Sequence, residues 1–496
     1  MFDKVLIANR GEIAVRIIRA CREEGLRAAA VYSDVDRAAP HVLLADEAVR
    51  IGTAPSAESY LSVEKLLEAA ARAGADAVHP GYGFLAENAD FARAVEAAGF
   101  VFIGPPAEAI GIMGDKTRAR ARMIAAGVPV IPGTDPLASE SEAIDGGREI
   151  GFPVMLKAAA GGGGKGMHVA GDEEELAGVF DRARREARSA FGDGRVFVER
   201  FLPRPRHVEI QVLADERRTV DLGERECSIQ RRHQKLIEEA PCTAIDDGLR
   251  RRMGDVAVRA AEAVDYRGAG TVEFMVEGDD FFFLEMNTRI QVEHPVTECV
   301  TGVDLVREQL RIAAGLPLLS GSEPPAARGH AIECRINAED PAAGFLPSAG
   351  RVERLELPAG PGVRWDGGIR PGSEIGLHYD SLLGKLVVHA ANREAAIRRM
   401  RAALEGLVID GVETTIPLHL AVMDEPDYRA NDVSIRYLDD HPGLGGSSDP
   451  ALRDAAIAAA VLLADRTRGA AALVDGKSSR DGRRGLSAWM SACREW

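Results

Sequence analysis

The amino-acid sequence predicts an α/β and α+β protein of three parts: an N-terminal domain with a doubly wound parallel sheet, a central domain with a hinged glycine-rich lobe, and a mixed C-terminal domain. Short apolar segments alternate with segments of helical spacing over the first third of the chain, as in parallel α/β sheets. After residue 115 the pattern changes to short strands around a run of four glycines, followed by two strands that carry acidic residues.

The first domain, residues 1–114, is expected to open as strand, turn and helix. A strand at 4–8 is followed by Gly11, and Ile13, Ile17 and Cys21 then recur at helical spacing. We expect the remaining elements to be strands at 28–33, 77–79 and 100–103 and a helix at 91–98. The turn after the first strand lacks G-x-G-x-x-G, so no dinucleotide site is implied.

The central domain, residues 115–329, has four consecutive glycines between Lys157 and Lys165. The apolar segments 152–156 and 167–170 predict a hairpin whose bare turn can place backbone N–H groups against phosphate oxygens. The run is not a Walker loop, since Ala159 and Gly166 stand where that motif needs Gly and Ser or Thr. A lobe of about residues 132–203 would carry this turn and close over a nucleotide. A flexible hairpin tip without a ligand is the alternative.

The composition of the chain argues against nucleic acid, zinc and a membrane as partners of this protein. Residues 330–444 form a third domain, and glycines and serines at 443–448 lead into a tail, residues 445–496. The net charge of −16 disfavours a nucleic-acid partner. Six scattered cysteines without a C-x-x-C pair indicate neither zinc nor disulfides and suit a reducing cytoplasm. The apolar run 455–464 is about half a membrane span, so we expect no membrane segment.

Two acidic strands carry the densest set of polar residues. Strand alternation places Glu285 and Asn287 on one face, where Glu273 of a neighbouring strand can meet them. Three oxygen ligands on adjacent strands predict a magnesium site with room for phosphate oxygens. A solvated acidic face is the alternative, which the apolar residues 281–284 disfavour.

The loop after these strands predicts an anion site. Arg289, Gln291 and Glu293 bring a cation, an amide and a carboxylate together beside the expected metal, which suits a small oxyanion that must lose a proton. By spacing alone, Arg231 and Arg232 of the basic run 230–235 are surface residues.

Together these segments resemble one family, the biotin carboxylases, which are the ATP-grasp subunit or domain of biotin-dependent carboxylases. The resemblance spans about residues 2–444 in unbroken order. It rests on the glycine turn and on the stretches 7–14 (IANRGEIA), 79–85 (HPGYGFL), 111–116 (GIMGDK), 206–212 (RHVEIQV), 230–241, 285–298 and 330–340. The central domain is then an ATP-grasp domain, and its glycine turn is a lid over the nucleotide.

The resemblance implies roles for residues around ATP, bicarbonate and biotin. The implied ATP-binding residues are Lys116, Lys157, Gly162, Gly163, Gly164, Met167, Glu199, Leu202, His207, Gln230, His233, Glu273 and Glu285. The implied ligands of Mg²⁺, or of Mn²⁺, are Glu273, Glu285 and Asn287. Bicarbonate is expected beside Lys235, Arg289, Gln291, Val292 and Glu293, and biotin beside Tyr82, Gly83, Arg335 and Asp380. The implied catalytic residues are Glu293, the base, with Arg335, Lys235 and Arg289.

The implied reaction is ATP- and bicarbonate-dependent carboxylation of biotin through carboxyphosphate, the first half-reaction of an acetyl-CoA or other acyl-CoA carboxylase, as in fatty acid biosynthesis. The chain has no Ala-Met-Lys-Met biotin-attachment sequence, so biotin would arrive on a biotin carboxyl carrier protein. Carboxyltransferase subunits and a second copy of the chain are the other partners that the resemblance implies, and the tail resembles a linker fragment. The alternatives are the corresponding subunit of a pyruvate carboxylase, another ATP-grasp carboxylate ligase, and a non-catalytic nucleotide sensor.

Overall fold

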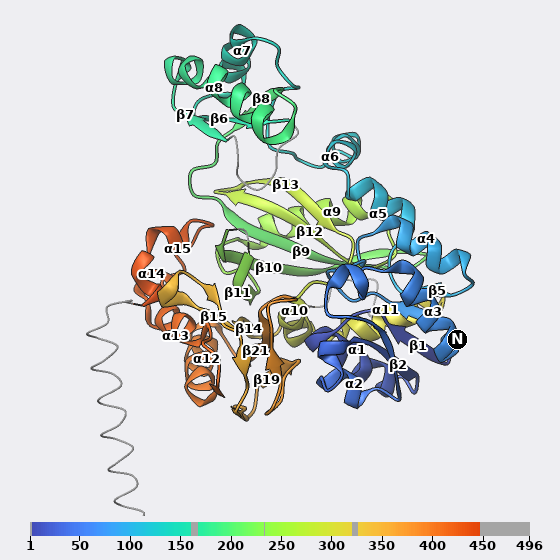
Figure 1. The fold of residues 1–496 in the computed structure, drawn as a ribbon. Coiled ribbons are helices and arrows are strands. Elements are labelled where there is room, and N and C mark those ends of the chain that lie inside the picture. The colour runs from blue at the N-terminus through green and yellow to red at the C-terminus, as the bar shows by residue number, and fades with distance from the viewer. Residues whose placement is uncertain (1, 160–166, 233, 320–325, 447–496) are drawn as a thin grey trace, which may run out of the picture.

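The computed structural model describes residues 2–159, 167–232, 234–319 and 326–446. Figure 1 shows an N-terminal α/β body, a long central sheet continued by the C-terminal segment, and a small lobe that stands away from both. The predicted fold class is confirmed. Among the described residues, no helix is both long enough and apolar enough to cross a membrane.

The N-terminal body is a five-stranded parallel sheet in the order β3-β2-β1-β4-β5. Helix α1 packs its apolar residues on one face, while α3 and α4 cover the other, which is the doubly wound arrangement. The predicted strand at 100–103 is shorter than expected. The elements are β1 (Lys4–Ile7), α1 (Gly11–Glu23), β2 (Arg27–Ser33), α2 (Pro40–Leu44), β3 (Glu47–Gly52), α3 (Val63–Ala73), β4 (Ala77–His79), α4 (Ala89–Ala97), β5 (Val101–Phe102) and α5 (Ala107–Met113).

The central sheet has eight antiparallel strands in the order β13-β12-β9-β10-β11-β14-β21-β19. The pairing of β11 with β14 joins segments on both sides of residue 330 into one sheet. Helix α9 packs its buried residues against β9, β10 and β12. The elements are β9 (Arg206–Ala214), β10 (Thr219–Arg231), β11 (Gln234–Ala240), α9 (Asp247–Glu262), β12 (Gly268–Glu277), β13 (Asp280–Asn287), α10 (His294–Thr301), α11 (Leu305–Ala313), β14 (His330–Asn337), β19 (Val363–Gly367) and β21 (Leu382–Ala390).

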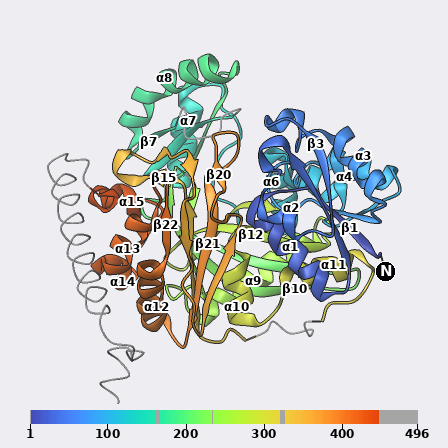
Figure 2. The same cartoon turned by 60° about the horizontal axis from the view of Figure 1, so that its bottom comes forward.

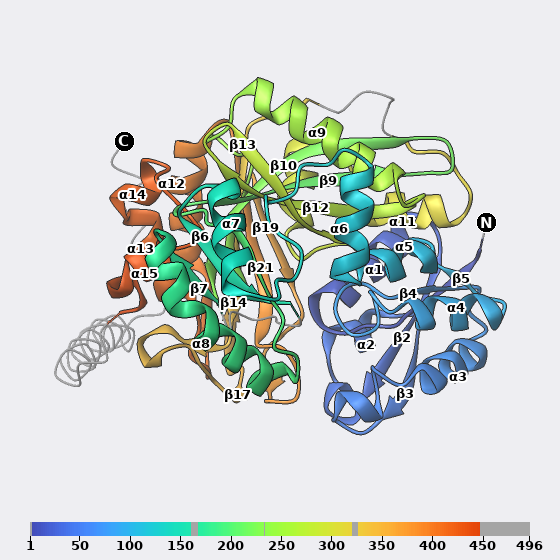
Figure 3. The same ribbon diagram turned by 90° about the horizontal axis from the view of Figure 1, so that it is seen from above.

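The small lobe is a three-stranded sheet, β7-β6-β8, covered by two helices (Figures 1 and 3). The predicted hairpin is confirmed, because β6 and β7 pair antiparallel from Val154 opposite Ala170 to Leu156 opposite His168. The glycine turn, 160–166, lies outside the described residues. Helix α6 (Lys116–Ala125) leads into the lobe, whose elements are α7 (Glu140–Ile150), β6 (Val154–Ala158), β7 (His168–Ala170), α8 (Glu173–Phe191) and β8 (Val196–Arg200).

The C-terminal helices pack on the β14 and β21 end of the central sheet (Figure 2). Small two-stranded ladders belong to the same C-terminal segment. The elements are β15 (Glu339–Asp340), β16 (Leu346–Pro347), β17 (Gly350–Arg351), β18 (Arg354–Glu356), β20 (Glu374–Ile375), α12 (Arg393–Gly406), β22 (Val408–Asp410), α13 (Ile416–Asp424), α14 (Pro426–Arg429) and α15 (Tyr437–Asp440). The tail from residue 447 is not among the described residues.

Candidate active site

Three cavities meet on one face of the central sheet. The central cavity, of about 1040 Å³, is lined by residues of the lobe and of the sheet, including Met167, Lys235 and Glu293. The α6 cavity, of about 510 Å³, is lined by Lys116 and Glu285 and opens from it. The Tyr82 cavity, of about 350 Å³, is lined by residues of the N-terminal body and of the β14 and β21 region.

A row of charged residues crosses the sheet beneath the central cavity. Strand register places Arg225 of β10, Glu209 of β9, Glu273 of β12 and Glu285 of β13 opposite one another in that order. Residues opposite one another on antiparallel strands lie close together on one face. The register, rather than any local motif, thus assembles an acidic floor in the cavity.

Lys235 of β11 is the cation at the centre of this floor. Its Nζ lies 2.8 Å from an oxygen of Glu273 and 2.7 Å from an oxygen of Glu293, and it also contacts Glu209. Burial would lower the pKa of Lys235, but these three carboxylates hold it well above its usual value. Lys235 is therefore charged at neutral pH.

Glu293 precedes α10 and lies between two cations. Its second oxygen accepts a hydrogen bond of 2.9 Å from Arg335 of β14. Burial would raise the pKa of Glu293, yet Lys235, Arg335 and Arg225 together hold it well below the usual range. Glu293 is an ionised carboxylate at the point where the central and Tyr82 cavities meet, because Lys235, Val292 and Arg335 line both.

The predicted metal ligands lie together. Asn287 donates a 2.8 Å hydrogen bond to Glu273, and Glu285 stands opposite Glu273 in the strand register. Burial and the charges of Glu273 and Glu87 raise the pKa of Glu285. Two carboxylates and the amide oxygen of Asn287, which here accepts a 2.8 Å hydrogen bond from Arg289, are the types of oxygen ligand that Mg²⁺ prefers, so the residues fit a divalent cation.

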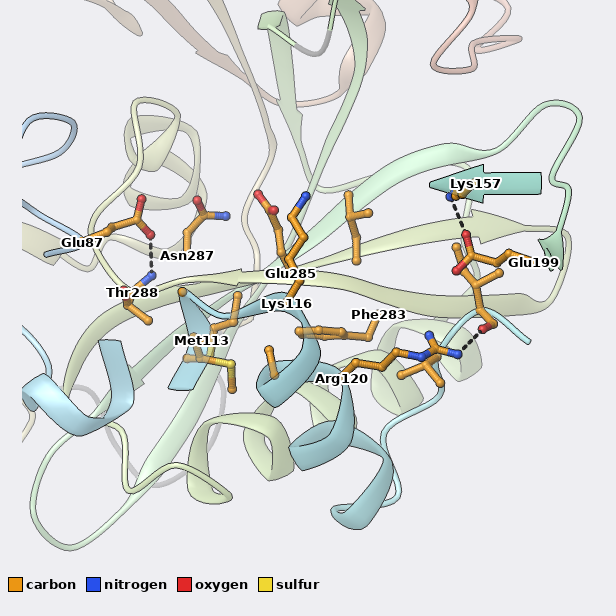
Figure 4. Close-up of a pocket in the computed structure, with 16 residues that line it drawn as sticks. Glu87, Met113, Lys116, Arg120, Lys157, Glu199, Phe283, Glu285, Asn287 and Thr288 are labelled. Carbon is orange, nitrogen blue, oxygen red and sulfur yellow. Dashed lines mark hydrogen bonds and ion pairs between the residues drawn. The ribbon is translucent and has the colours of Figure 1, made fainter. Parts of the chain in front are cut away.

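Figure 4 shows the α6 cavity, with Glu285 and Lys116 near the centre of the view. Asp115 accepts hydrogen bonds from the backbone N–H groups of Thr117 and Arg118 at the start of α6, which places Lys116 in the first turn facing Glu285. Lys157 of β6 forms an ion pair with Glu199 of the neighbouring strand β8. Both lysines therefore line the space above the acidic floor.

The other residues predicted around the nucleotide are divided between the cavity wall and the core. Met167, His207 and Gln230 line the central cavity, and His207 Nε2 lies 2.9 Å from an oxygen of Glu273. Leu202 is buried and is not among the residues that line the described cavities. Gly162, Gly163, Gly164 and His233 lie outside the described residues.

The loop at 288–293 connects the acidic floor to the N-terminal body. Arg289 Nε donates a 2.8 Å hydrogen bond to Glu87, which also accepts from the backbone of Thr288. Gln291 donates to Glu273 at 2.7 Å and accepts from Arg225 at 2.7 Å. The N-terminal body and the central sheet thus both hold the loop in place.

The residues predicted for biotin lie together in the Tyr82 cavity. Tyr82, Gly83 and Asp380 line it with Arg335, and Tyr82 donates a hydrogen bond to Glu12. Asp380 accepts a 2.8 Å hydrogen bond from the backbone of Leu382. Burial and Glu12 raise the pKa of Tyr82 well above its usual value, so its hydroxyl stays protonated.

Four site residues were not identified from the sequence: Glu87, Glu209, Arg225 and Glu238. Arg225 is fully buried and makes five hydrogen bonds to five different side chains, so it organises the floor from within the sheet. The alternation of polar and apolar residues along 206–212 is the one local signal for Glu209, and it names no partner.

Comparisons with known proteins identify relatives over most of the chain. Family models match residues 1–110 (biotin carboxylase, N-terminal domain), 115–320 (carbamoyl-phosphate synthase L chain, ATP binding domain) and 333–440 (biotin carboxylase C-terminal domain). The biotin carboxylase of Haemophilus influenzae is 52% identical over 90% of this chain and 100% of its own length. A pyruvate carboxylase subunit of Methanothermobacter thermautotrophicus is 51% identical over 89% of this chain and 90% of its own length.

A solved structure gives the same result. It is the biotin carboxylase domain dimer of the Hydrogenobacter thermophilus 2-oxoglutarate carboxylase, in complex with MgADP, ADP and bicarbonate. The sequence identity is 48%, the TM-score is 0.82, and the match covers 90% of this chain and 100% of that chain.

Proposed function

This chain belongs to the biotin carboxylase family, and from that premise we propose how its residues carry out the ATP- and bicarbonate-dependent carboxylation of biotin. The family's reaction converts ATP, bicarbonate and biotin to ADP, phosphate and carboxybiotin. One observation carries the assignment of roles. Lys235, Val292 and Arg335 line both the central cavity and the Tyr82 cavity, so a group formed in one can reach the other without leaving the protein.

ATP binds in the central and α6 cavities. Lys116 and Lys157 provide the cations for its phosphates, and Lys157 exchanges its ion pair with Glu199 for a phosphate oxygen. Mg²⁺ suits the oxygen ligands of Glu273, Glu285 and Asn287, and when bound it neutralises phosphate charge. The hinged lobe closes over the nucleotide and excludes water.

Bicarbonate binds beside Lys235, Arg289, Gln291, Val292 and Glu293. Glu293 accepts the proton of bicarbonate as a bicarbonate oxygen attacks the γ-phosphorus, and the bond to ADP breaks to leave carboxyphosphate. Lys235 and Arg335 then divide their charge between Glu293 and the bound anion. Lys235 and Arg335 then stabilise the ionised form of Glu293 less, so the pKa of Glu293 rises and Glu293 is a stronger base than in the free site.

Biotin binds in the Tyr82 cavity, beside Tyr82, Gly83 and Asp380. The Arg335 guanidinium stabilises the negative charge that develops on the biotin oxygen when its nitrogen loses a proton. Carboxyphosphate breaks at its bond between carbon and the phosphate oxygen to give CO2 and phosphate. The phosphate accepts the proton of the biotin nitrogen, and the nitrogen then attacks CO2 to form carboxybiotin.

The partners follow from the same premise. Biotin arrives on a biotin carboxyl carrier protein, and carboxyltransferase subunits consume carboxybiotin. The chain forms a homodimer, as the relative described as a domain dimer does. Relatives at 51% and 48% identity are named for a pyruvate carboxylase and a 2-oxoglutarate carboxylase, which supports the proposal that the transferase decides the carboxyl acceptor. A cytoplasmic location stays a prediction from the sequence.

The test is ADP release by the purified protein with Mg²⁺ and ATP, with and without bicarbonate and free biotin. We expect hydrolysis to require bicarbonate and to rise with biotin. Release that requires a different carboxylate or an amine would point to another ATP-grasp ligase, and ATP binding without turnover would point to a nucleotide sensor.

The Glu293→Gln variant tests the base. We expect ATP binding to be kept and bicarbonate-dependent turnover to fall by at least about a hundredfold, since the amide cannot accept the proton. Glu298→Gln is the matched control, because Glu298 is buried and ion-paired with Arg16 but does not line the cavities. Unchanged turnover in Glu293→Gln would remove Glu293 from the role of base.

A further inference from the structure

Behind Arg335 lie two buried carboxylates that the proposed reaction does not use. Glu238 of β11 and Glu333 of β14 stand directly opposite each other in the strand register, and both side chains are fully buried. Opposite residues of an antiparallel pair have Cβ atoms about 4.5–5.5 Å apart. Two glutamates are therefore held together in the interior of the sheet.

Three of the four carboxylate oxygens of Glu238 and Glu333 have no hydrogen-bond donor among the described residues. Arg335 Nε donates a 2.6 Å hydrogen bond to one oxygen of Glu238, while the other oxygen of Glu238 and both oxygens of Glu333 have no partner among the described residues. Buried carboxylate oxygens without a donor are costly. A proton on Glu333 would supply the donor that the free oxygen of Glu238 lacks.

The charges around Glu333 also favour a proton on this residue. Five other buried carboxylates near Glu333 each have a cation within ion-pair distance: Glu12 has Lys385, Glu209 has Arg225, Glu273 and Glu293 have Lys235, and Glu238 has Arg335. Within the described part of the chain, Glu333 has no ion pair.

The charged groups that face Glu333 are Glu238 from β11, Arg335 from β14, Lys385 from β21 and Glu293 from the loop before α10. Burial, Glu238 and Glu293 raise the pKa of Glu333 well above its usual value, and the two cations do not offset this. Lys385 is engaged elsewhere, since its Nζ donates to the backbone oxygen of Val292 at 2.7 Å and lies 3.1 Å from Glu12.

We propose that Glu333 is a neutral carboxylic acid that donates a hydrogen bond to Glu238 and so positions the Arg335 guanidinium between Glu238 and Glu293. With Glu333 neutral, Glu238 keeps one oxygen for Glu333 and the other for Arg335. An ionised Glu333 would repel Glu238 and draw Arg335 away from Glu293. In this structure Arg335 Nη2 lies 2.9 Å from Oε2 of Glu293. Glu333 is thus a positioning residue, and its effect on turnover rests on the function proposed for Arg335.

The first experiment is infrared spectroscopy of the full chain with isotopically labelled glutamate, at pH 8 without ligands. We expect a protonated-carboxyl C=O band that is present in the parent and absent in Glu333→Gln. Glu239→Gln is the matched control, since its neighbours His330 and Arg393 lower the pKa of that buried glutamate, and the band should persist. A parent without the band, or a Glu333→Gln protein that keeps it, would overturn the proposal.

Turnover gives a second readout. In Glu333→Gln the amide N–H replaces the acid as donor, so we expect kcat for biotin-dependent ATP hydrolysis to stay within about twofold of the parent. In Glu333→Ala the donor is lost, and kcat should fall by about tenfold or more with little change in the KM for ATP. A tenfold loss in Glu333→Gln would show that Glu333 works as an anion. The infrared result does not depend on activity. A parent protein that does not hydrolyse ATP would refute the proposed carboxylase function, but it would not contradict the inference that Glu333 is protonated.

Discussion

Replacing Lys235 with methionine should destabilise the protein by an amount that follows from its three contacts. Lys235 pairs with Glu209, Glu273 and Glu293, and its side chain is only 10% exposed. Glu209 keeps Arg225 and Glu293 keeps Arg335 in the variant. Among the described residues, Glu273 keeps no ion pair with a lysine or arginine, only His207 and the hydrogen bonds from Asn287 and Gln291. The variant therefore leaves one buried carboxylate without a compensating lysine or arginine, rather than three. We expect the free energy of unfolding to fall by about 3–5 kcal/mol at pH 8.

The loss should shrink as the pH falls. In the parent, burial acts to raise the pKa of Glu273 and of Glu293, but Lys235 and the other neighbouring cations hold both below the usual value. The stability that these carboxylates contribute is present above their unfolded pKa of about 4.3 and is lost as the pH falls through their lower folded values. In the variant, burial raises the pKa of Glu273, so a proton can neutralise it in the folded state at mildly acidic pH. The gap between parent and variant is thus largest at pH 8 and smaller at pH 5.

Urea unfolding of both proteins at pH 8 and pH 5 measures this gap. Arg398→Met is the control, because the Arg398 to Glu394 pair on α12 is an exposed i,i+4 pair and should contribute little at either pH. A destabilisation below about 1 kcal/mol, or one that does not change with pH, would refute the view that Lys235 neutralises the acidic floor.

Two further substitutions test the roles assigned to neighbouring residues. Arg335→Ala should lower biotin-dependent turnover by at least about a hundredfold while the KM for ATP changes little, because it removes the group that stabilises charge on biotin; an equal loss of ATP binding would indicate a structural role. Glu285→Gln should raise the Mg²⁺ concentration needed for half-maximal ATP hydrolysis by about tenfold or more, since it removes one charged ligand. Glu277→Gln, on the same hairpin but outside the cavities, should leave that concentration unchanged, and a similar shift in both variants would remove Glu285 from the metal site.

Local patterns in the sequence predicted several contacts of the site. The alternation of Glu285 and Asn287 on one strand, with Glu273 on the next, predicted a shared site, and Asn287 donates to Glu273 at 2.8 Å. The apolar segments around the glycines predicted the hairpin that β6 and β7 form. These predictions needed only the period of a strand and the pairing of segments close together in the chain.

The contacts that were missed depend on pairings between distant segments. Arg225 meets Glu209 because β10 and β9 adopt one particular register, and a shift of one residue would turn the arginine to the opposite face. Glu87 reaches Arg289 from 202 residues away, since the N-terminal body packs against the end of β13. Neither partner can be named from alternation alone.

The sequence by itself determined the fold class, the family resemblance and the types of side chain available for the chemistry, because periodicity and motif residues are local properties of the chain. Only the tertiary structure decided which charges meet. The pairing of β11 with β14 brings Arg335 and Glu333 to Glu238, and Arg335 reaches on to Glu293 in the next loop. These long-range pairings remove the side chains from water together, and burial then decides which carboxylates stay charged beside a cation and which retain a proton.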